Sequence, residues 1–156
     1  MHDPFAEAGL RLLRVQEEGF REVLAGLPDG ALNWRPGPDT NSIAVLVEHA
    51  WGSAQMWTAR AAGQEIERDR AAEFRANRDA AELQEVLARG LARVEELLAA
   101  ADPTRYDEAD EPAARPGQAR TEPITRAWCL LHAVEHVSEH LGQAQLTRQL
   151  WQQRQA

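Results

Sequence analysis

The chain has 156 residues, of which 44% are hydrophobic and 27% are charged, and its formal net charge is −8. We expect one domain that covers residues 1–156, because this length is enough for a single hydrophobic core. The acidic balance argues against a nucleic-acid backbone as the main partner, and no apolar run is long enough to cross a membrane.

The residue types exclude further classes of chemistry. All 17 basic residues are arginine, so neither a Schiff-base lysine nor a P-loop lysine is available. The single cysteine, Cys129, excludes an internal disulfide and a CxxC site. The start of the chain, MHDPFAEAGL, lacks the pattern of a secretion signal, and we therefore expect a cytoplasmic protein.

The first half of the chain predicts two helices separated by a loop. The first helix spans 4–24, where Asp3 can cap its N-terminus and apolar residues recur at helical spacing. Proline and glycine are frequent in 28–40, which predicts a loop. The second helix spans 42–61, with Asn41 or Ser42 as its cap.

The second half predicts two more helices. A polar linker covers 63–77 and has room for a helical turn, and the third helix follows at 79–101. A loop rich in proline, alanine and acidic residues covers 102–120. The fourth helix spans 121–152 and tolerates Pro123 in its first turn. Since no strand-like alternation is present, we predict an all-α four-helix bundle.

Three of the five histidines share one face of the fourth helix. His132, His136 and His140 follow one another at four-residue spacing, and residues i and i+4 of a helix lie on the same side. Imidazole is a common metal ligand, so the stripe indicates a metal site; the alternative is a solvated polar face. The first and last histidines lie about 12 Å apart along the helix axis, too far to share one ion. The site therefore uses either His132 with His136 or His136 with His140.

A third ligand has to come from another helix. His2 precedes the first helix, whereas His49 lies among apolar residues in the middle of the second. A lone histidine in such a place is more often a core residue, but the histidine pair elsewhere favours His49 as a ligand. Three protein ligands with an open fourth position are typical of catalytic metal sites.

Other side chains receive less specific predictions. Glu48, Glu135 and Glu139 flank the histidines and are expected on a solvated face, and Arg35 is expected to be a surface charge. Cys129 and three tryptophans are expected in the core: Trp51, Trp57 and Trp128. An aliphatic stripe on the fourth helix motivates the prediction of a homodimer; it consists of Leu130, Val134, Val137 and Leu141.

Two segments resemble the DinB/YfiT-like family of metalloenzymes. The first is LNWRPGPDTNSIAVLVEHAWGSAQMW, with a Trp-Arg-Pro loop, a helix cap and one histidine on a helix; the second is HVSEHLGQ, a His-x3-His pair followed by Gly-Gln. The resemblance extends over nearly the whole chain and implies a four-helix bundle that is often dimeric. By position it implies a metal triad of His49, His136 and His140, which selects one of the two histidine pairs. His132 then becomes an extra group, used for packing, for support of a ligand or for proton transfer.

The resemblance also implies a class of function. Relatives bind a divalent metal such as nickel or zinc, and some are transferases or isomerases that use a low-molecular-weight thiol. We therefore expect a metal-dependent enzyme that acts on a small-molecule substrate, either as a thiol-dependent S-transferase or as a hydrolase. The alternative is a non-catalytic bundle that a metal stabilises and that acts in stress response or protein interaction.

Overall fold

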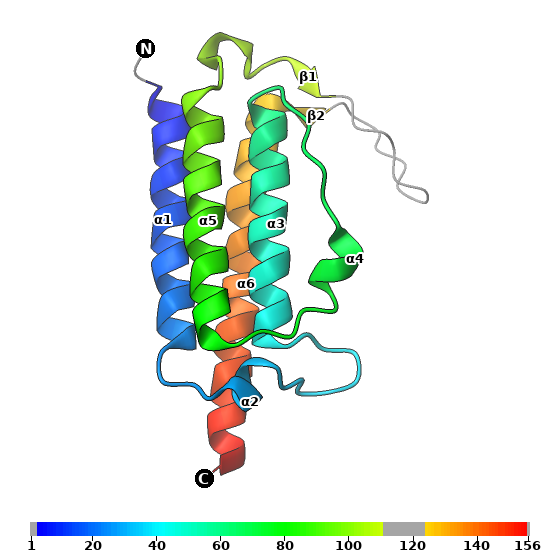
Figure 1. Cartoon of the computed structure of the whole chain (residues 1–156). Coiled ribbons are helices and arrows are strands. Elements are labelled where there is room, and N and C mark those ends of the chain that lie inside the picture. Colours follow the sequence, from blue (N-terminus) through cyan, green and yellow to red (C-terminus); the bar gives the residue numbers. More distant parts are fainter. Residues whose placement is uncertain (1–2, 111–123, 156) are drawn as a thin grey trace.

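Four long helices packed as a bundle make up most of the chain (Figure 1). The computed structural model describes residues 3–110 and 124–155. The long helices are α1 (Pro4–Leu24), α3 (Ile43–Ala61), α5 (Ala80–Ala99) and α6 (Arg126–Gln155). The short elements are α2 (Asp29–Leu32), α4 (Arg70–Glu73), the 3₁₀ turn η1 (Pro103–Arg105), β1 (Ala109–Asp110) and β2 (Ile124–Thr125). The predicted all-α four-helix bundle is confirmed.

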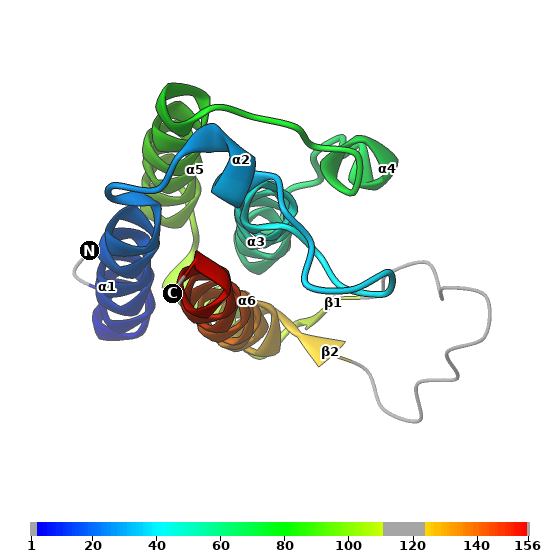
Figure 2. The same cartoon turned by 90° about the horizontal axis from the view of Figure 1, so that it is seen from below.

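The four long helices stand at the corners of a square when they are viewed along their axes (Figure 2). Each of α1 and α3 packs against both α5 and α6. In Figure 1, α1 and α6 run in one direction and α3 and α5 in the other. The short helix α4 lies outside the square, beside α3.

The starts of the long helices follow from local capping. The Asp3 carboxylate accepts hydrogen bonds from the backbone N–H groups of Phe5 and Ala6, and the Ser42 hydroxyl accepts one from Val45. Asp79 forms a reciprocal capping box with Glu82 at the start of α5. These caps satisfy backbone donors that have no partner inside the helix, and they agree with the predicted starts of the first three long helices.

Helix α3 is the most buried helix of the bundle and carries His49. Most of its side chains are buried, and its large indole, Trp51, is fully buried. A Cβ atom placed on Gly90 of α5 would lie 2.9 Å from Cε3 and 3.1 Å from Cβ of Trp51. The glycine therefore allows α5 to approach the Trp51 ring closely.

This close contact predicts opposite effects for two Gly→Ala substitutions. Gly90→Ala should lower the melting temperature, because overpacking costs about 1–3 kcal/mol and outweighs the helix propensity of alanine. Gly142→Ala should raise the melting temperature, because a Cβ atom at this position of α6 meets no atom within 4 Å. Replacing a glycine inside a helix with alanine adds about 0.5–1 kcal/mol to the free energy of unfolding. Thermal unfolding followed by circular dichroism measures both. Equal stabilisation by the two substitutions would contradict the tight α3–α5 contact.

The start of the last helix differs from the prediction. Helix α6 begins at Arg126, not at Thr121, because Ile124 and Thr125 pair antiparallel with Asp110 and Ala109 as a two-stranded sheet. Strands of two residues are too short to show an alternating pattern in the sequence. Thr121 and Pro123 lie outside the described residues.

Two packing predictions also need correction. Trp128 is 37% exposed and is not a core residue, whereas Trp51, Trp57 and Cys129 are buried as predicted. The aliphatic stripe of α6 faces the bundle, since Leu130 and Val137 are buried in its core. The other two residues of the stripe, Val134 and Leu141, are partly buried and pack against the same core. The stripe therefore does not support the homodimer, which stays a prediction. No described helix is long and apolar enough to cross a membrane.

Candidate metal centre

Three histidine rings from two helices converge on one point. His49 comes from α3, and His136 and His140 come from adjacent turns of α6. The Nε2 atom of His136 lies 3.2 Å from Nε2 of His49 and 3.1 Å from Nε2 of His140. Each ring offers a ligand atom, and these atoms all lie within 4.8 Å of one another. We call these three residues the histidine cluster.

The partners of two Nδ1 atoms indicate which ring nitrogen carries the proton. His49 Nδ1 lies 2.9 Å from Oε2 of Glu73, and His140 Nδ1 lies 2.9 Å from Oε1 of Gln143. Both oxygens accept, so each Nδ1–H is the donor, and each Nε2 keeps its lone pair. Arg68 Nη2 also lies 3.2 Å from His49 Nδ1, but it has two oxygen acceptors, Glu73 Oε2 and the His49 carbonyl. Neutral acceptor atoms about 3 Å apart repel one another unless a cation or a proton lies between them. The donor set of the histidine cluster therefore fits a metal ion.

Burial favours the neutral, metal-binding form of His136 and His140. His49 and His140 are buried and His136 is half-buried. Burial, together with the charges of His140 and His49, lowers the pKa of His136 to about 3. Burial also lowers the pKa of His140. Because a metal binds only the neutral imidazole, a site with lowered pKa values loses little to competing protons near neutral pH.

A buried ion pair from the linker orients His49. Arg68 donates to both carboxylate oxygens of Glu73, at 2.6 Å from Nε and 2.7 Å from Nη2, and it also donates to the His49 carbonyl. Burial raises the pKa of Glu73, but the hydrogen bonds from His49 and Arg68 outweigh it, and the net shift is downward. Glu73 therefore stays ionised and holds the His49 Nδ1–H. A carboxylate behind a ligating histidine is a common arrangement in metal sites.

The linker approaches α3 closely because of Gly52. A Cβ atom at Gly52 would collide with Oε1 of Glu73. The space that Gly52 leaves one turn after His49 is thus filled by the Glu73 carboxylate. Phe74, the next residue, packs its ring against the His49 ring with centroids 4.6 Å apart. The short helix α4 therefore covers His49 from the outer side of the bundle.

Comparison with known proteins identifies the family. The profile of the DinB superfamily matches residues 12–144 of the chain. The chain belongs to the DinB superfamily. No curated protein sequence matches it.

Two solved structures resemble this DinB-superfamily chain in fold. A conserved protein from Enterococcus faecalis has a TM-score of 0.73 and 19% identity, over 92% of this chain and 95% of that one. A DinB-like protein from Bacillus cereus has a TM-score of 0.69 and 15% identity, over 90% of this chain and 89% of that one. At these identities the two structures support the fold alone.

His132 lies beside the histidine cluster but is not part of it. Its Nδ1 atom lies 3.0 Å from Oε2 of Glu135, and its ring stacks on Trp128 with centroids 4.6 Å apart. Trp57 meets the same ring edge-on. The ring centroid of His132 is 5.6 Å from that of His136. Of the two histidine pairs that spacing allowed, the structure brings His136 and His140 together with His49.

The flanking charged residues divide into two groups. Glu135 and Glu139 are exposed, as predicted. The prediction for Glu48 is wrong, because Arg78 donates to its Oε1 at 2.7 Å and leaves the Glu48 side chain 19% exposed. Arg35 is exposed but is more than a free surface charge, since it donates to the carbonyls of Thr40 and Phe74. It thereby ties the first loop of this DinB-superfamily chain to the end of α4.

Proposed function

We propose that the chain is a metal-dependent enzyme in which the histidine cluster binds one divalent ion. The convergence of three Nε2 atoms carries this proposal, because neutral imidazoles are preferred ligands of zinc and nickel. Three protein ligands are the usual number in catalytic sites, where the fourth position serves water or a substrate. A divalent ion bound there supplies Lewis acidity, which brings the pKa of a bound water or thiol close to neutral.

The reaction class follows from that chemistry and from the surrounding residues. We propose either transfer from a low-molecular-weight thiol or hydrolysis, in both cases with a small-molecule substrate. Glu73 fixes the orientation of His49, and Gln143 fixes that of His140. His132 donates its Nδ1–H to Glu135, so its Nε2 carries the lone pair, and we propose that this ring supports proton transfer beside the histidine cluster.

A non-catalytic role is the second candidate, and one observation favours it. The proposed ligands come from α3 and α6, two helices far apart in the chain, so an ion would join them. Such an ion would stabilise the bundle even without turnover. In that case the protein would act in stress response or through protein interaction.

Metal analysis of the untagged protein tests the proposal. We expect one equivalent of zinc or nickel per chain by inductively coupled plasma mass spectrometry after purification without a metal-affinity tag. The absence of stoichiometric metal would contradict both candidate functions. The loaded protein would then be screened with thiols plus electrophiles and with hydrolysable esters and amides. Stoichiometric metal without turnover in either screen would favour the non-catalytic role.

A further inference from the structure

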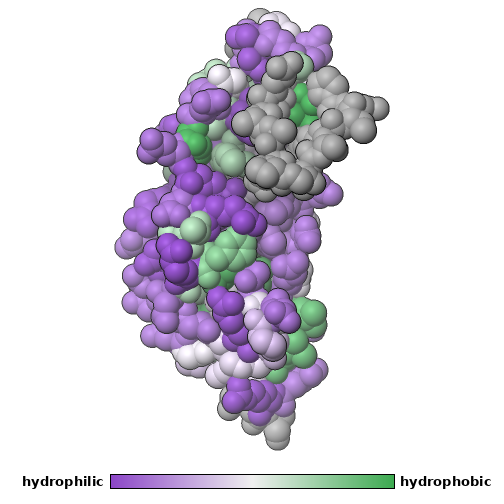
Figure 3. Space-filling view, turned by 90° about the vertical axis from the view of Figure 1, so that its right-hand side faces the viewer, coloured by the Kyte–Doolittle hydropathy of each residue, from purple (hydrophilic) through white to green (hydrophobic). Residues whose placement is uncertain are grey.

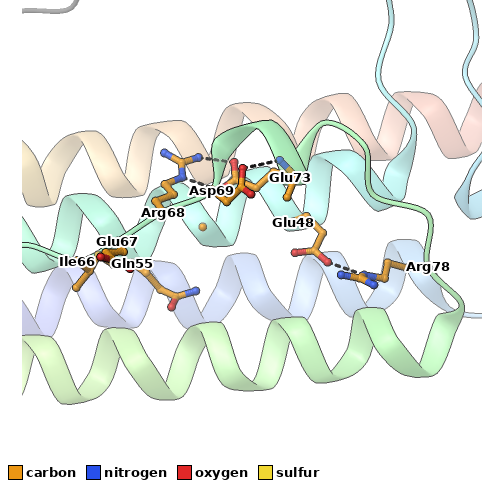
Figure 4. A pocket seen from close by; sticks show the side chains of 10 residues that line it. Glu48, Gln55, Ile66, Glu67, Arg68, Asp69, Glu73 and Arg78 are labelled. Carbon is orange, nitrogen blue, oxygen red and sulfur yellow. Dashed lines mark hydrogen bonds and ion pairs between the residues drawn. The ribbon is translucent and has the colours of Figure 1, made fainter.

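A hollow lies next to the histidine cluster, between α3 and the linker that carries α4 (Figure 4). Its volume is about 260 Å³. Residues of α3, of the linker and of α4 form its wall: Glu48, Gly52, Gln55, Ile66, Glu67, Arg68, Asp69, Ala72, Glu73 and Arg78. The wall includes Arg68 and Glu73, which orient His49, but none of the three clustered histidines. We therefore treat the hollow, here called the linker cavity, as a site that adjoins the histidine cluster and is distinct from it.

The linker cavity is rich in hydrogen-bond acceptors. Four carboxylates and two guanidinium groups line it, which leaves it negatively charged. Both guanidinium groups are engaged, because Arg68 binds Glu73 and Arg78 binds Glu48. Figure 4 shows the Arg78–Glu48 pair toward one end of the cavity and Gln55 toward the other. Its walls therefore offer acceptors at two ends and few spare donors.

Two of these acceptor atoms have no donor within the described part of the chain. Glu48 accepts from Arg78 through Oε1, while its Oε2 receives no hydrogen bond from residues 3–110 or 124–155. Gln55 uses its Nε2 to donate to the Trp51 carbonyl, and its Oε1 likewise receives none from those residues. Partly buried acceptors of this kind gain free energy from a ligand that brings N–H donors.

The spacing of the acceptors distinguishes an organic cation from a metal ion. Among the described residues, the histidine cluster is the only group of three or more ligand residues with atoms within 4.8 Å of one another. The carboxylates of the linker cavity are thus too dispersed to surround one ion. Dispersed acceptors match a longer molecule with an N–H group at each end. Ile66 and Ala72 supply apolar wall for a hydrocarbon chain between those ends.

We propose that the linker cavity binds a small organic cation that carries primary ammonium groups, with a linear diamine as the simplest member of this class. One ammonium group donates to Glu48 Oε2 and the other to Gln55 Oε1. The volume is slightly below the usual range of about 300–1,000 Å³ for ligand pockets, which favours a short chain. The surrounding face is largely hydrophilic (Figure 3), which suits a charged ligand. This binding does not require a metal and goes beyond the proposed metal chemistry.

Isothermal titration calorimetry with 1,4-diaminobutane tests the proposal on the full chain. The titration is run at about 150 mM salt, where the Debye length of ~8 Å screens general attraction to an acidic protein. Succinate, which has the same length but opposite charge, is the ligand control. Gln55→Leu removes one of the two acceptors and Glu48→Gln removes the negative charge of the other, while Glu65→Gln removes an exposed carboxylate outside the cavity.

We expect saturable binding of one diamine per chain and no binding of succinate. Each cavity variant should weaken binding by about tenfold or more, since a hydrogen bond to a charged group contributes ~1.5–3 kcal/mol. Glu65→Gln should bind like the parent. No saturable binding, equal binding of succinate, or unchanged affinity in Gln55→Leu would overturn the proposal. Circular dichroism checks the fold of each variant. The metal content of every sample is also measured, so that an absence of metal can be distinguished from an absence of diamine binding.

Discussion

Replacing His136 with alanine is expected to remove nearly all bound metal from the protein. His136 is the central member of the histidine cluster, because its Nε2 lies 3.2 Å from that of His49 and 3.1 Å from that of His140. Loss of a group behind a ligand typically costs 10–100-fold in metal affinity, so loss of the ligand itself should cost at least about 100-fold. The fold should persist, since the His136 side chain is only half-buried.

The matched control for this substitution is His132→Ala. His132 lies on the same helix, one turn earlier, and its side chain is 25% exposed, but its Nδ1 faces Glu135 outside the histidine cluster. Competition with a metal-binding dye measures the affinity of parent and variants for zinc and nickel. Parent and His132→Ala should bind alike. Equal loss of metal in both variants, or retention in both, would contradict the proposed ligand set.

Replacing Glu73 with glutamine is expected to weaken metal binding and to destabilise the fold. A glutamine at this position carries no negative charge, so the hydrogen bond that it accepts from the His49 Nδ1–H is weaker. Metal affinity should therefore fall by about 10–100-fold. It also leaves the Arg68 guanidinium, whose side chain is 10% exposed, without its anionic partner. Breaking a buried ion pair from one side typically costs about 3–5 kcal/mol of folding free energy.

Urea unfolding of the metal-free protein isolates the second effect. The control is Glu85→Gln, which breaks an ion pair with Arg89 in which both side chains are at least 70% exposed. That change should cost less than about 1 kcal/mol, because exposed ion pairs contribute little. If Glu73→Gln lowers the free energy of unfolding no more than Glu85→Gln does, Glu73 does not support the site as described.

The fold could be predicted wherever its causes are local. Asp3, Ser42 and Asp79 cap the helices that follow them, and these caps together with the apolar spacing placed three of the four long helices correctly. The start of α6 was missed because it depends on pairing between Ile124 and Asp110, a contact between distant parts of the chain. No sequence pattern within either two-residue strand predicts that pairing.

The histidine cluster and its supports differ in the same way. Helical spacing left two pairs open, His132 with His136 and His136 with His140, and the resemblance to a family selected the second. His49 was expected as the third ligand from the residues alone, because it lies in the middle of another predicted helix. Glu73 and Arg68 escaped prediction, because α4 is a single helical turn inside a polar linker and carries no periodic pattern. The one local indication was Gly52. Its missing side chain indicates that another segment approaches α3 closely at this point, but it does not indicate which segment that is.

The division of the histidine cluster between two helices has a consequence for assembly. His136 and His140 lie side by side on α6. Their two ring nitrogens could therefore bind one ion together in any helical fragment that contains both residues. His49 joins them only when α3 has docked, because it is brought in by tertiary structure from 87 residues away. An isolated α6 peptide and the whole chain would therefore differ in affinity for the proposed ion by the contribution of one imidazole and its preorganisation. The affinity of the whole chain for the ion therefore reports on the packing of α3 against α6.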